Sequence, residues 1–166
     1  MTCEICELIK DKKAKRIFSD ELIEIVMSPK PASLGHILIY PKEHKTILEQ
    51  VPDNIVSHIF NAANKLSAVL FEALGEEGTN IIIQNGLDAG QTIPHFSINI
   101  IPRKENDGIN FEWKPQSISD PVMDEVTSKL SSSISGIKEK VAEDKVEEIK
   151  EEEITNYMIK QLERIP

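Results

Sequence analysis

The chain has 166 residues, of which 40% are hydrophobic and 28% charged, a composition typical of a globular protein with one ordinary domain and an appendage. Its net charge of -9 argues against nucleic-acid binding, because non-specific binding needs a basic surface. No apolar run approaches the roughly 20 residues that a membrane span requires, and the N-terminus lacks an apolar signal-peptide segment. We therefore expect a cytoplasmic protein without a membrane partner.

The first part of the chain is expected to alternate strands and helices. Residues 21–27 and 36–40 are short apolar stretches followed by prolines, and both predict strands. Asp53 is expected to cap a long helix that ends at Gly75. The apolar stripe of this helix comprises Ile55, Ile59, Ala63, Leu66, Leu70 and Leu74. Residues 80–85, NIIIQN, predict a buried strand, and a glycine-bearing loop and a further strand follow.

A short basic cluster lies near the N-terminus. It consists of Lys10, Lys12, Lys13, Lys15 and Arg16. We interpret this cluster as a solvated loop, because so short a run of cations is more typical of a loop than of a binding arm.

From about residue 104 the character of the chain changes. Asp120-Pro121 predicts a helix start, since proline suits the first helical position and acidic residues favour the N-terminal turn. Apolar residues then follow helical spacing at Val122, Val126, Leu130, Ile134, Ile137 and Val141. Residues 139–153 are acidic and are interpreted as a solvated helix. The final segment, 154–166, is expected to pack either on its own dimer or on a partner protein.

Two cysteines and four histidines are candidate metal ligands. Cys3 and Cys6 form a CxxC pair, which alone is compatible with redox chemistry, metal binding or neither. No predicted strand precedes the pair, as it usually does in a redox dithiol. Zinc would need two further ligands, which His44 and His95 can supply. His58 falls within the long predicted helix, where it is expected to be half exposed.

The segment AGQTIPHFSINIIPR, residues 89–103, places three polar side chains at alternate positions. His95, Ser97 and Asn99 would share one face of a strand. Such a row either faces solvent on an antiparallel strand or lines a pocket, and the spacing alone leaves both interpretations open.

Three motifs together resemble those of the histidine-triad (HIT) superfamily, in its zinc-containing CxxC branch. They are Cys3 to Cys6, the segment GHILIYPKEH at 35–44, and the segment from Asn85-Gly86 to Pro102-Arg103. The resemblance implies an α+β fold in which a HIT-like domain at residues 1–115 has a five-stranded antiparallel sheet and a long helix, commonly in a homodimer. Residues 116–166 would form a C-terminal helical, acidic extension.

The resemblance also implies a zinc site. In relatives with the paired cysteines, a structural zinc is held by residues that correspond to Cys3, Cys6, His44 and His95. A tetrahedral set of this kind leaves no open position for a reactant, so the zinc would be structural rather than catalytic. It would join the N-terminus to the last strand and stabilise the fold.

The family's catalytic pattern is His-x-His-x-His, and its middle histidine attacks phosphorus to form a covalent nucleotidyl intermediate. In this chain Ser97 takes the middle position and Asn99 the third. A serine hydroxyl is a poor nucleophile without a base, and His95 would be occupied by zinc. Asn99 cannot accept a proton at any useful pH. The sequence therefore predicts a degenerate active site.

The loop that surrounds the scissile phosphate in active relatives is still matched, by Asn85, Gly90, Gln91 and Thr92. Small residues with amide and hydroxyl donors suit an anion, because backbone N–H groups can approach it closely. Ser28 takes the position of an aspartate that binds the ribose hydroxyls in active relatives, a loss expected to cost about 1–3 kcal/mol of nucleoside affinity.

We therefore predict a zinc-stabilised protein whose pocket binds a nucleotide or another anionic or heteroaromatic metabolite without nucleotidyl transfer. The predicted ligand-binding residues are Asn85, Gly90, Gln91, Thr92, Ser97, Asn99 and His36. His36 would either orient the row above it or serve as a hydrogen-bonded core histidine. Two alternatives stay open: an enzyme with altered chemistry, as a divergent nucleotide hydrolase or a non-phosphoryl catalyst, and a module that docks a partner protein through residues 154–166.

Overall fold

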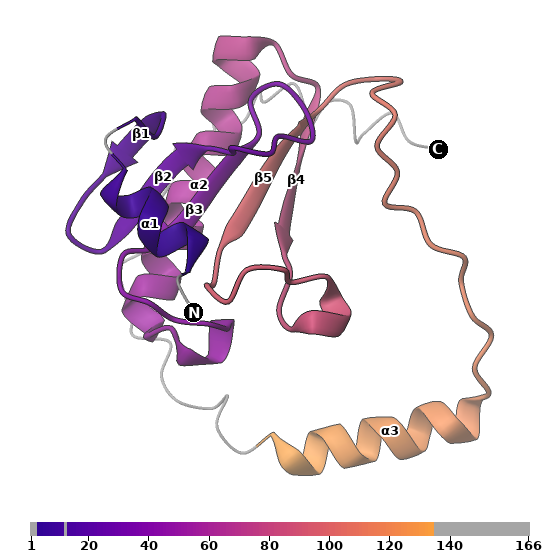
Figure 1. The fold of residues 1–166 in the computed structure, drawn as a ribbon. Helices are drawn as coiled ribbons and strands as arrows, with labels where there is room; N and C mark the ends of the chain where they lie inside the picture. The colour runs from indigo at the N-terminus through magenta and orange to yellow at the C-terminus, as the bar shows by residue number, and fades with distance from the viewer. Residues whose placement is uncertain (1–2, 12, 135–166) are drawn as a thin grey trace, which may run out of the picture. The chain divides into compact units, whose positions relative to one another are not determined.

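The computed structural model describes residues 3–11 and 13–134 (Figure 1). The chain divides into two units, Met1–Ile109 and Asn110–Pro166. The expected domain boundary at residue 115 stays a prediction.

The first unit has the predicted α+β fold, with a five-stranded sheet in the order β1-β2-β3-β5-β4 and antiparallel pairing throughout. The strands are β1 (Arg16–Ser19), β2 (Ile23–Met27), β3 (Ile37–Pro41), β4 (Gly78–Ile83) and β5 (Ile98–Arg103). Helices α1 (Glu4–Lys10) and α2 (Asp53–Leu74) lie on opposite faces of this sheet (Figure 1). Each helix covers its own apolar cluster.

The larger cluster lies between α2 and the sheet. The helix buries Ile55, Ile59, Ala63 and Leu70 against β-strand isoleucines such as Ile23, Ile39 and Ile98. Four of the six predicted stripe residues are thus buried, Leu66 is partly buried, and Leu74 is 42% exposed near the helix end. The helix ends as predicted at Gly75, which adopts the left-handed conformation with φ 63°.

Two expectations about the elements are wrong in detail. Asp53 does not cap α2, because the extended residue before the helix is Pro52 and Asp53 is already helical. The apolar segment NIIIQN does form a strand, β4, but this strand is not buried. It lies at the edge of the sheet, and Ile81 is 44% exposed. The apolar run predicts a strand, whereas the place of that strand in the sheet depends on pairing with distant residues.

The smaller cluster lies between α1 and the other face of the sheet. Its buried members are Cys3, Ile5, Val26 and Tyr40. Because side chains alternate along a strand, Val26 and Tyr40 point away from the α2 side, where Ile25 and Ile39 lie. This smaller cluster positions the CxxC pair.

In the second unit, helix α3 (Asp120–Ser133) begins at Asp120-Pro121, as predicted. Its apolar side chains are exposed, among them Val122, Val126 and Leu130. Ile137, Val141 and the segments 139–153 and 154–166 lie outside the described residues. No helix within the described residues is long and apolar enough to cross a membrane. The cytoplasmic location and the homodimer stay predictions.

Candidate metal centre and adjoining pocket

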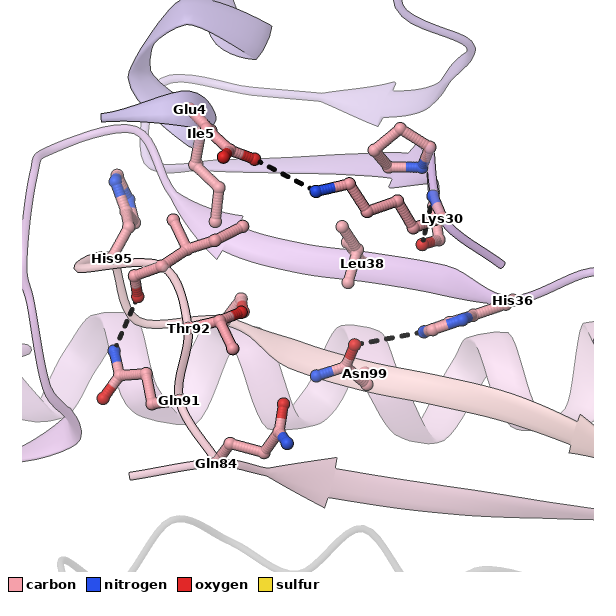
Figure 2. A pocket seen from close by; sticks show the side chains of 14 residues that line it. Glu4, Ile5, Lys30, His36, Leu38, Gln84, Gln91, Thr92, His95 and Asn99 are labelled. Carbon is pink, nitrogen blue, oxygen red and sulfur yellow. Dashed lines mark hydrogen bonds and ion pairs between the residues drawn. The ribbon is translucent and has the colours of Figure 1, made fainter. Parts of the chain in front are cut away.

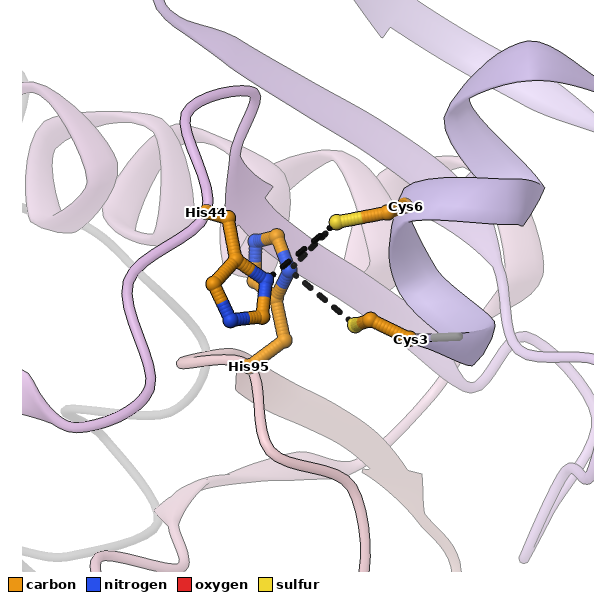
Figure 3. A group of neighbouring side chains, drawn as sticks. All are labelled: Cys3, Cys6, His44 and His95. Carbon is orange, nitrogen blue, oxygen red and sulfur yellow. Dashed lines mark hydrogen bonds between the residues drawn. The ribbon is translucent and has the colours of Figure 1, made fainter. Parts of the chain in front are cut away.

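The fold brings four potential metal ligands together from three separate segments (Figure 3). Cys3 and Cys6 come from the start of α1, His44 from the loop after β3, and His95 from the loop before β5. Their ligand atoms all lie within 4.8 Å of one another. This cluster could hold a metal ion, and its members are the four residues predicted from the sequence.

The spacing of the donor atoms suits a tetrahedral zinc ion. The Cys6 Sγ lies 3.3 Å from His44 Nδ1 and 3.6 Å from His95 Nδ1, and the Cys3 Sγ lies 3.5 Å from His95 Nδ1. Bond lengths of about 2.3 Å to sulfur and about 2.05 Å to nitrogen, at tetrahedral angles, separate the two ligand atoms by about 3.5 Å. The arrangement therefore fits the chemistry of its donor set.

A hydrogen bond to the backbone fixes the orientation of the His95 ring. Its Nε2 lies 2.9 Å from the Pro41 carbonyl oxygen and donates to it, which leaves the Nδ1 lone pair directed at the cysteines. Burial lowers the pKa of His95, and the nearby His44 lowers it further, while the bond to Pro41 acts in the opposite direction. The ring is consequently neutral at physiological pH, as a metal ligand must be.

Without a cation, the Cys6 thiol favours its protonated form. Burial raises the pKa of Cys6, and the neighbouring Cys3 raises it further, while Lys10 lowers it. A bound cation would reverse this preference, because the thiolate is the form that ligates a metal.

A cavity of about 170 Å³ adjoins the cluster (Figure 2). Among the predicted ligand-binding residues, those that line it are His36, Gln91, Thr92, Ser97 and Asn99. Ser28 lines the cavity as well. The resemblance places Ser28 where active relatives have the aspartate that binds the ribose hydroxyls. The strand β5 begins only at Ile98, so His95 and Ser97 lie in the loop that precedes it, and the expected strand face is incomplete.

Asn85 and Gly90 do not line this cavity. The Asn85 Oδ1 accepts a hydrogen bond from the Leu48 N–H at 2.9 Å, and its amide group donates to the Glu49 carboxylate at 2.9 Å. Gly90 has a φ of 84°, and a Cβ at this position would lie 2.7 Å from the Gln84 amide nitrogen. Both residues thus shape the loop, and their contact with a ligand stays a prediction.

The amide of Gln91 is committed to the same loop. Its Nε2 donates to the carbonyl oxygens of Thr46 and Ile93 at 2.7 and 2.9 Å, and its Oε1 accepts from the Gly86 N–H at 2.8 Å. The bond to Thr46 holds the loop against the segment after β3, and the other two bonds are within the loop. Among the predicted ligand-binding residues, the polar groups that remain for a ligand are those of Thr92, Ser97 and Asn99.

His36 orients Asn99. The Ala32 N–H donates to His36 Nδ1 at 3.0 Å, so the ring proton is on Nε2, which donates to Asn99 Oδ1 at 3.1 Å. The Asn99 oxygen is therefore engaged, and its NH₂ group is left as a donor for the cavity. Burial lowers the pKa of His36, and the bond to Asn99 only partly opposes this effect.

Helix α1 supplies one wall of the cavity, which the sequence did not predict. Glu4 and Ile5 line it, and Lys30 lies opposite, with its Nζ 3.6 Å from the Glu4 Oε2 (Figure 2). The sequence did contain a feature that could have predicted this wall, because Glu4 and Ile5 lie between the two cysteines. In this fold, the contact of the CxxC pair with His95 brings Glu4 and Ile5 to the cavity that Ser97 also lines.

His58 takes no part in either site. Its Nε2 lies 2.6 Å from the Asp20 Oδ2, and its side chain is 40% exposed, which agrees with the half-exposed helix position predicted.

Comparisons with known proteins agree with this geometry. The HIT domain model matches residues 10–106, and the chain belongs to the HIT family. It is 32% identical over 117 residues to the adenylylsulfatase HINT3 of Arabidopsis thaliana, an alignment that covers 70% of this chain and only 58% of that protein.

Two solved structures share the fold. One is a HIT family protein from Bacillus anthracis, with a TM-score of 0.72 and 28% identity over 80% of this chain and 97% of that one. The other is a zinc-bound histidine triad family protein from Mycobacterium smegmatis, with a TM-score of 0.61 and 28% identity over 80% of this chain and 98% of that one.

Proposed function

We propose that this HIT protein is a metal-stabilised binding protein. A structural zinc would be held by Cys3, Cys6, His44 and His95, and the adjoining pocket would bind a nucleotide or another anionic or heteroaromatic metabolite without nucleotidyl transfer. The donor geometry and the zinc-bound relative from Mycobacterium smegmatis support the zinc.

The observation that carries the binding role is the state of the two imidazoles around Ser97. His95 directs one nitrogen at the cysteines and donates with the other to Pro41. His36 accepts from Ala32 with one nitrogen and donates to Asn99 with the other. Neither ring has a lone pair left to take a proton from the Ser97 hydroxyl, and that hydroxyl is a weak nucleophile without a base.

The remaining pocket groups suit an anion bound mainly by neutral donors. These are the Asn99 NH₂ and the hydroxyls of Ser97 and Thr92, with Lys30 as the one cationic side chain among the lining residues that the structure describes. Desolvation costs less free energy for neutral donors than for charged ones, and neutral donors select among ligands by the geometry of their hydrogen bonds. The serine at position 28 weakens any contact with ribose hydroxyls.

Titration calorimetry with a defined panel tests the binding role. The panel contains AMP, an adenosine phosphoramidate, a dinucleoside polyphosphate, inorganic phosphate and, because the Arabidopsis relative is named an adenylylsulfatase, adenylyl sulfate. Asn99→Ala should weaken binding about tenfold or more, since one hydrogen bond to a charged ligand contributes about 1.5–3 kcal/mol. Asn61→Ala, an exposed change on α2, is the matched control. No binding across the whole panel contradicts the proposal.

The same panel separates binding from altered chemistry. Product formation should stay at the background rate under conditions that saturate the pocket. Turnover that Ser97→Ala abolishes, while nucleotide affinity is kept, would establish the enzyme alternative and end the binding-only interpretation.

A second candidate function rests on α3, whose apolar side chains Val122, Met123, Val126 and Leu130 are all 46% exposed or more. Such a stripe favours docking to a protein partner. Truncation after residue 115, followed by light scattering for the predicted homodimer and pull-down with the native extract, tests whether the extension binds its own dimer or another protein.

A further inference from the structure

Arg16 joins the end of the CxxC helix to the sheet. From the first position of β1, its Nη1 donates to the Asp11 carbonyl at 2.7 Å, and its Nη2 donates to the carbonyls of Ile9 at 2.6 Å and Leu8 at 3.2 Å. These carbonyls belong to the last turn and C-cap of α1, beyond which the helix supplies no further N–H groups, and the Leu8 carbonyl also accepts from the Asp11 N–H at 3.2 Å. The Nε–H of Arg16 donates to the Glu24 carboxylate.

Glu24 is the counterpart on the sheet and is only 1% exposed. Besides Arg16, it accepts from the Ser19 hydroxyl at 3.0 Å, and the Lys42 Nζ lies 3.8 Å away. A buried carboxylate is stable only when its charge and its oxygens are matched in this way. The node formed by Arg16 and Glu24 is therefore a fixed point on β2, to which the end of α1 is attached.

The position of α1 decides where the two thiols lie. The helix has seven residues, too few to be stable by itself, so its place depends on tertiary contacts. Cys3 and Cys6 are at its beginning, and the node holds its end. Between them the Tyr40 ring packs under the helix and meets His95 edge-on, with centroids 6.0 Å apart. The two imidazoles are held by other segments.

We propose that Arg16 and Glu24 are positioning residues of the metal centre. They hold α1 so that both thiols face both imidazoles before a metal ion arrives, and neither residue touches the ion. A site whose ligands are already in place binds a metal ion more tightly, because the entropy cost of ordering the ligands does not reduce the binding free energy. This inference rests on the proposed zinc site.

Arg103 provides a matched control. It forms the same kind of node, with the Asp107 carboxylate at 2.6 Å and the Ile109 carbonyl, and its side chain is 23% exposed, against 29% for Arg16. It lies at the end of β5 that is farther along the chain from His95. A change at Arg103 should lower stability without a specific effect on the metal centre.

The experiment measures Zn²⁺ affinity by competition with a chromophoric chelator, on full-length protein and at a temperature where circular dichroism shows each variant to be folded. Arg16→Ala and Glu24→Gln should weaken Zn²⁺ binding about 10-fold, the lower end of the effect of losing a group bonded directly to a ligand, because both residues act through α1. Arg103→Ala should stay within about threefold of the parent protein. Arg16→Lys should rescue little, because an ammonium cannot reproduce the planar fork.

A second readout separates positioning from ligation. In Co²⁺-loaded Arg16→Ala the tetrahedral absorption bands should persist at saturation, because all four ligands remain. Equal Zn²⁺ affinities for the parent, Arg16→Ala and Glu24→Gln overturn the inference, and so does an equal loss in Arg103→Ala. If the parent protein itself takes up no stoichiometric Zn²⁺, the proposed metal centre fails. Should Arg16→Ala not fold, Glu24→Gln and Arg16→Lys carry the comparison.

Discussion

The metal centre and the pocket adjoin, and they share both His95 and helix α1, yet their side chains are used differently. In the candidate metal centre, the four donor atoms all lie within 4.8 Å of one another. In the pocket, both His36 nitrogens and the Gln91 amide nitrogen are bonded to the protein itself. The cluster thus presents its donors to a common point, whereas the imidazole and amide groups of His36 and Gln91 are used to hold the fold of the pocket.

The difference also shows how one site supports the other. Ile5 lies between the two cysteines, is 2% exposed, and lines the pocket. A metal that fixes the start of α1 therefore fixes a wall of the pocket as well. The two sites are therefore connected in structure through α1, whatever chemistry the pocket performs.

The largest expected effect is that of removing the metal. Cys6→Ser replaces a thiolate with a hydroxyl that does not ionise near neutral pH, so the tetrahedral set is broken. We expect a loss of roughly 3 kcal/mol or more and a fall in Tm on the order of 10–20 °C. Differential scanning calorimetry and metal analysis by mass spectrometry provide the measurement.

Chelation supplies the control for this prediction. A strong chelator should bring the parent protein to the Tm of Cys6→Ser, while it leaves the Tm of that variant unchanged. If the parent protein contains no zinc and its Tm does not change with the chelator, the four residues do not form a stabilising metal centre.

The sequence predicted the metal centre better than the pocket, for a physical reason. The CxxC pair and the histidines left several interpretations open, and the resemblance to the HIT superfamily selected Cys3, Cys6, His44 and His95, the four residues that the fold brings together. Pocket residues are common polar types whose roles depend on hydrogen bonds across the fold. Gln91 was predicted as a ligand contact, whereas its amide holds the loop through three bonds to the protein.

The same limit applies to the fold. Helical periodicity predicted α2 and its buried face, because this pattern is local. It could not show that β4 is an edge strand, because strand order follows from long-range pairing. Arg16 was interpreted as part of a solvated loop, and only the return of the chain through β1 and β2 brings it to Glu24.

A second prediction concerns the loop that borders the pocket. Gln91→Ala removes three hydrogen bonds, one that joins the loop to Thr46 in the segment after β3 and two within the loop, to Gly86 and Ile93. We expect a loss of about 1–3 kcal/mol and weaker binding of any ligand from the panel, although the Gln91 amide has no spare donor for that ligand. Urea denaturation and calorimetry on the same preparation measure both effects.

Gln84→Ala is the matched control for this loop. Gln84 lines the same pocket from an exposed position, and no hydrogen bond of its side chain is found within the described part of the chain. Its removal should leave stability within about 0.5 kcal/mol. Equal losses for the two variants would mean that the Gln91 bonds do not hold the loop.

A third prediction is the pH dependence contributed by His36, whose pKa burial lowers below its ordinary value of about 6.5. Between these two pKa values the unfolded chain binds more protons, so this contribution to stability is complete above about pH 6.5 and falls as the pH decreases. The slope cannot exceed about 1.4 kcal/mol per pH unit for one group. His36→Gln keeps a donor and an acceptor but does not titrate, so its stability curve should be flatter than that of the parent between pH 6.5 and 5.

Both proteins must be compared with the metal centre in one state, zinc-saturated or zinc-free, because metal binding itself depends on pH and stabilises the fold. Parallel curves for parent and variant would show that the pKa of His36 is not lowered in the fold. The ring would then gain a proton in the folded protein as readily as in the unfolded chain, and burial would not be what keeps it neutral.

The smallest effect is expected at Tyr40, in the apolar cluster under α1. Its hydroxyl is buried and has no hydrogen-bond partner among the described residues, and burial raises the pKa of the phenol far above its usual value. Tyr40→Phe removes a polar group that water solvates only in the unfolded chain, so stability should stay equal or rise by up to about 1 kcal/mol.

Ser33→Ala makes the comparison for Tyr40 quantitative, because the Ser33 hydroxyl does have a partner, the Pro102 carbonyl at 2.8 Å. Its loss should cost about 0.5–1.5 kcal/mol in the same urea titration. If Tyr40→Phe costs as much, a buried water joins the Tyr40 hydroxyl to Glu24 nearby. The support beneath the CxxC helix would then be a continuous polar network that runs from Arg16 to Tyr40, and not an ion pair beside an apolar cluster.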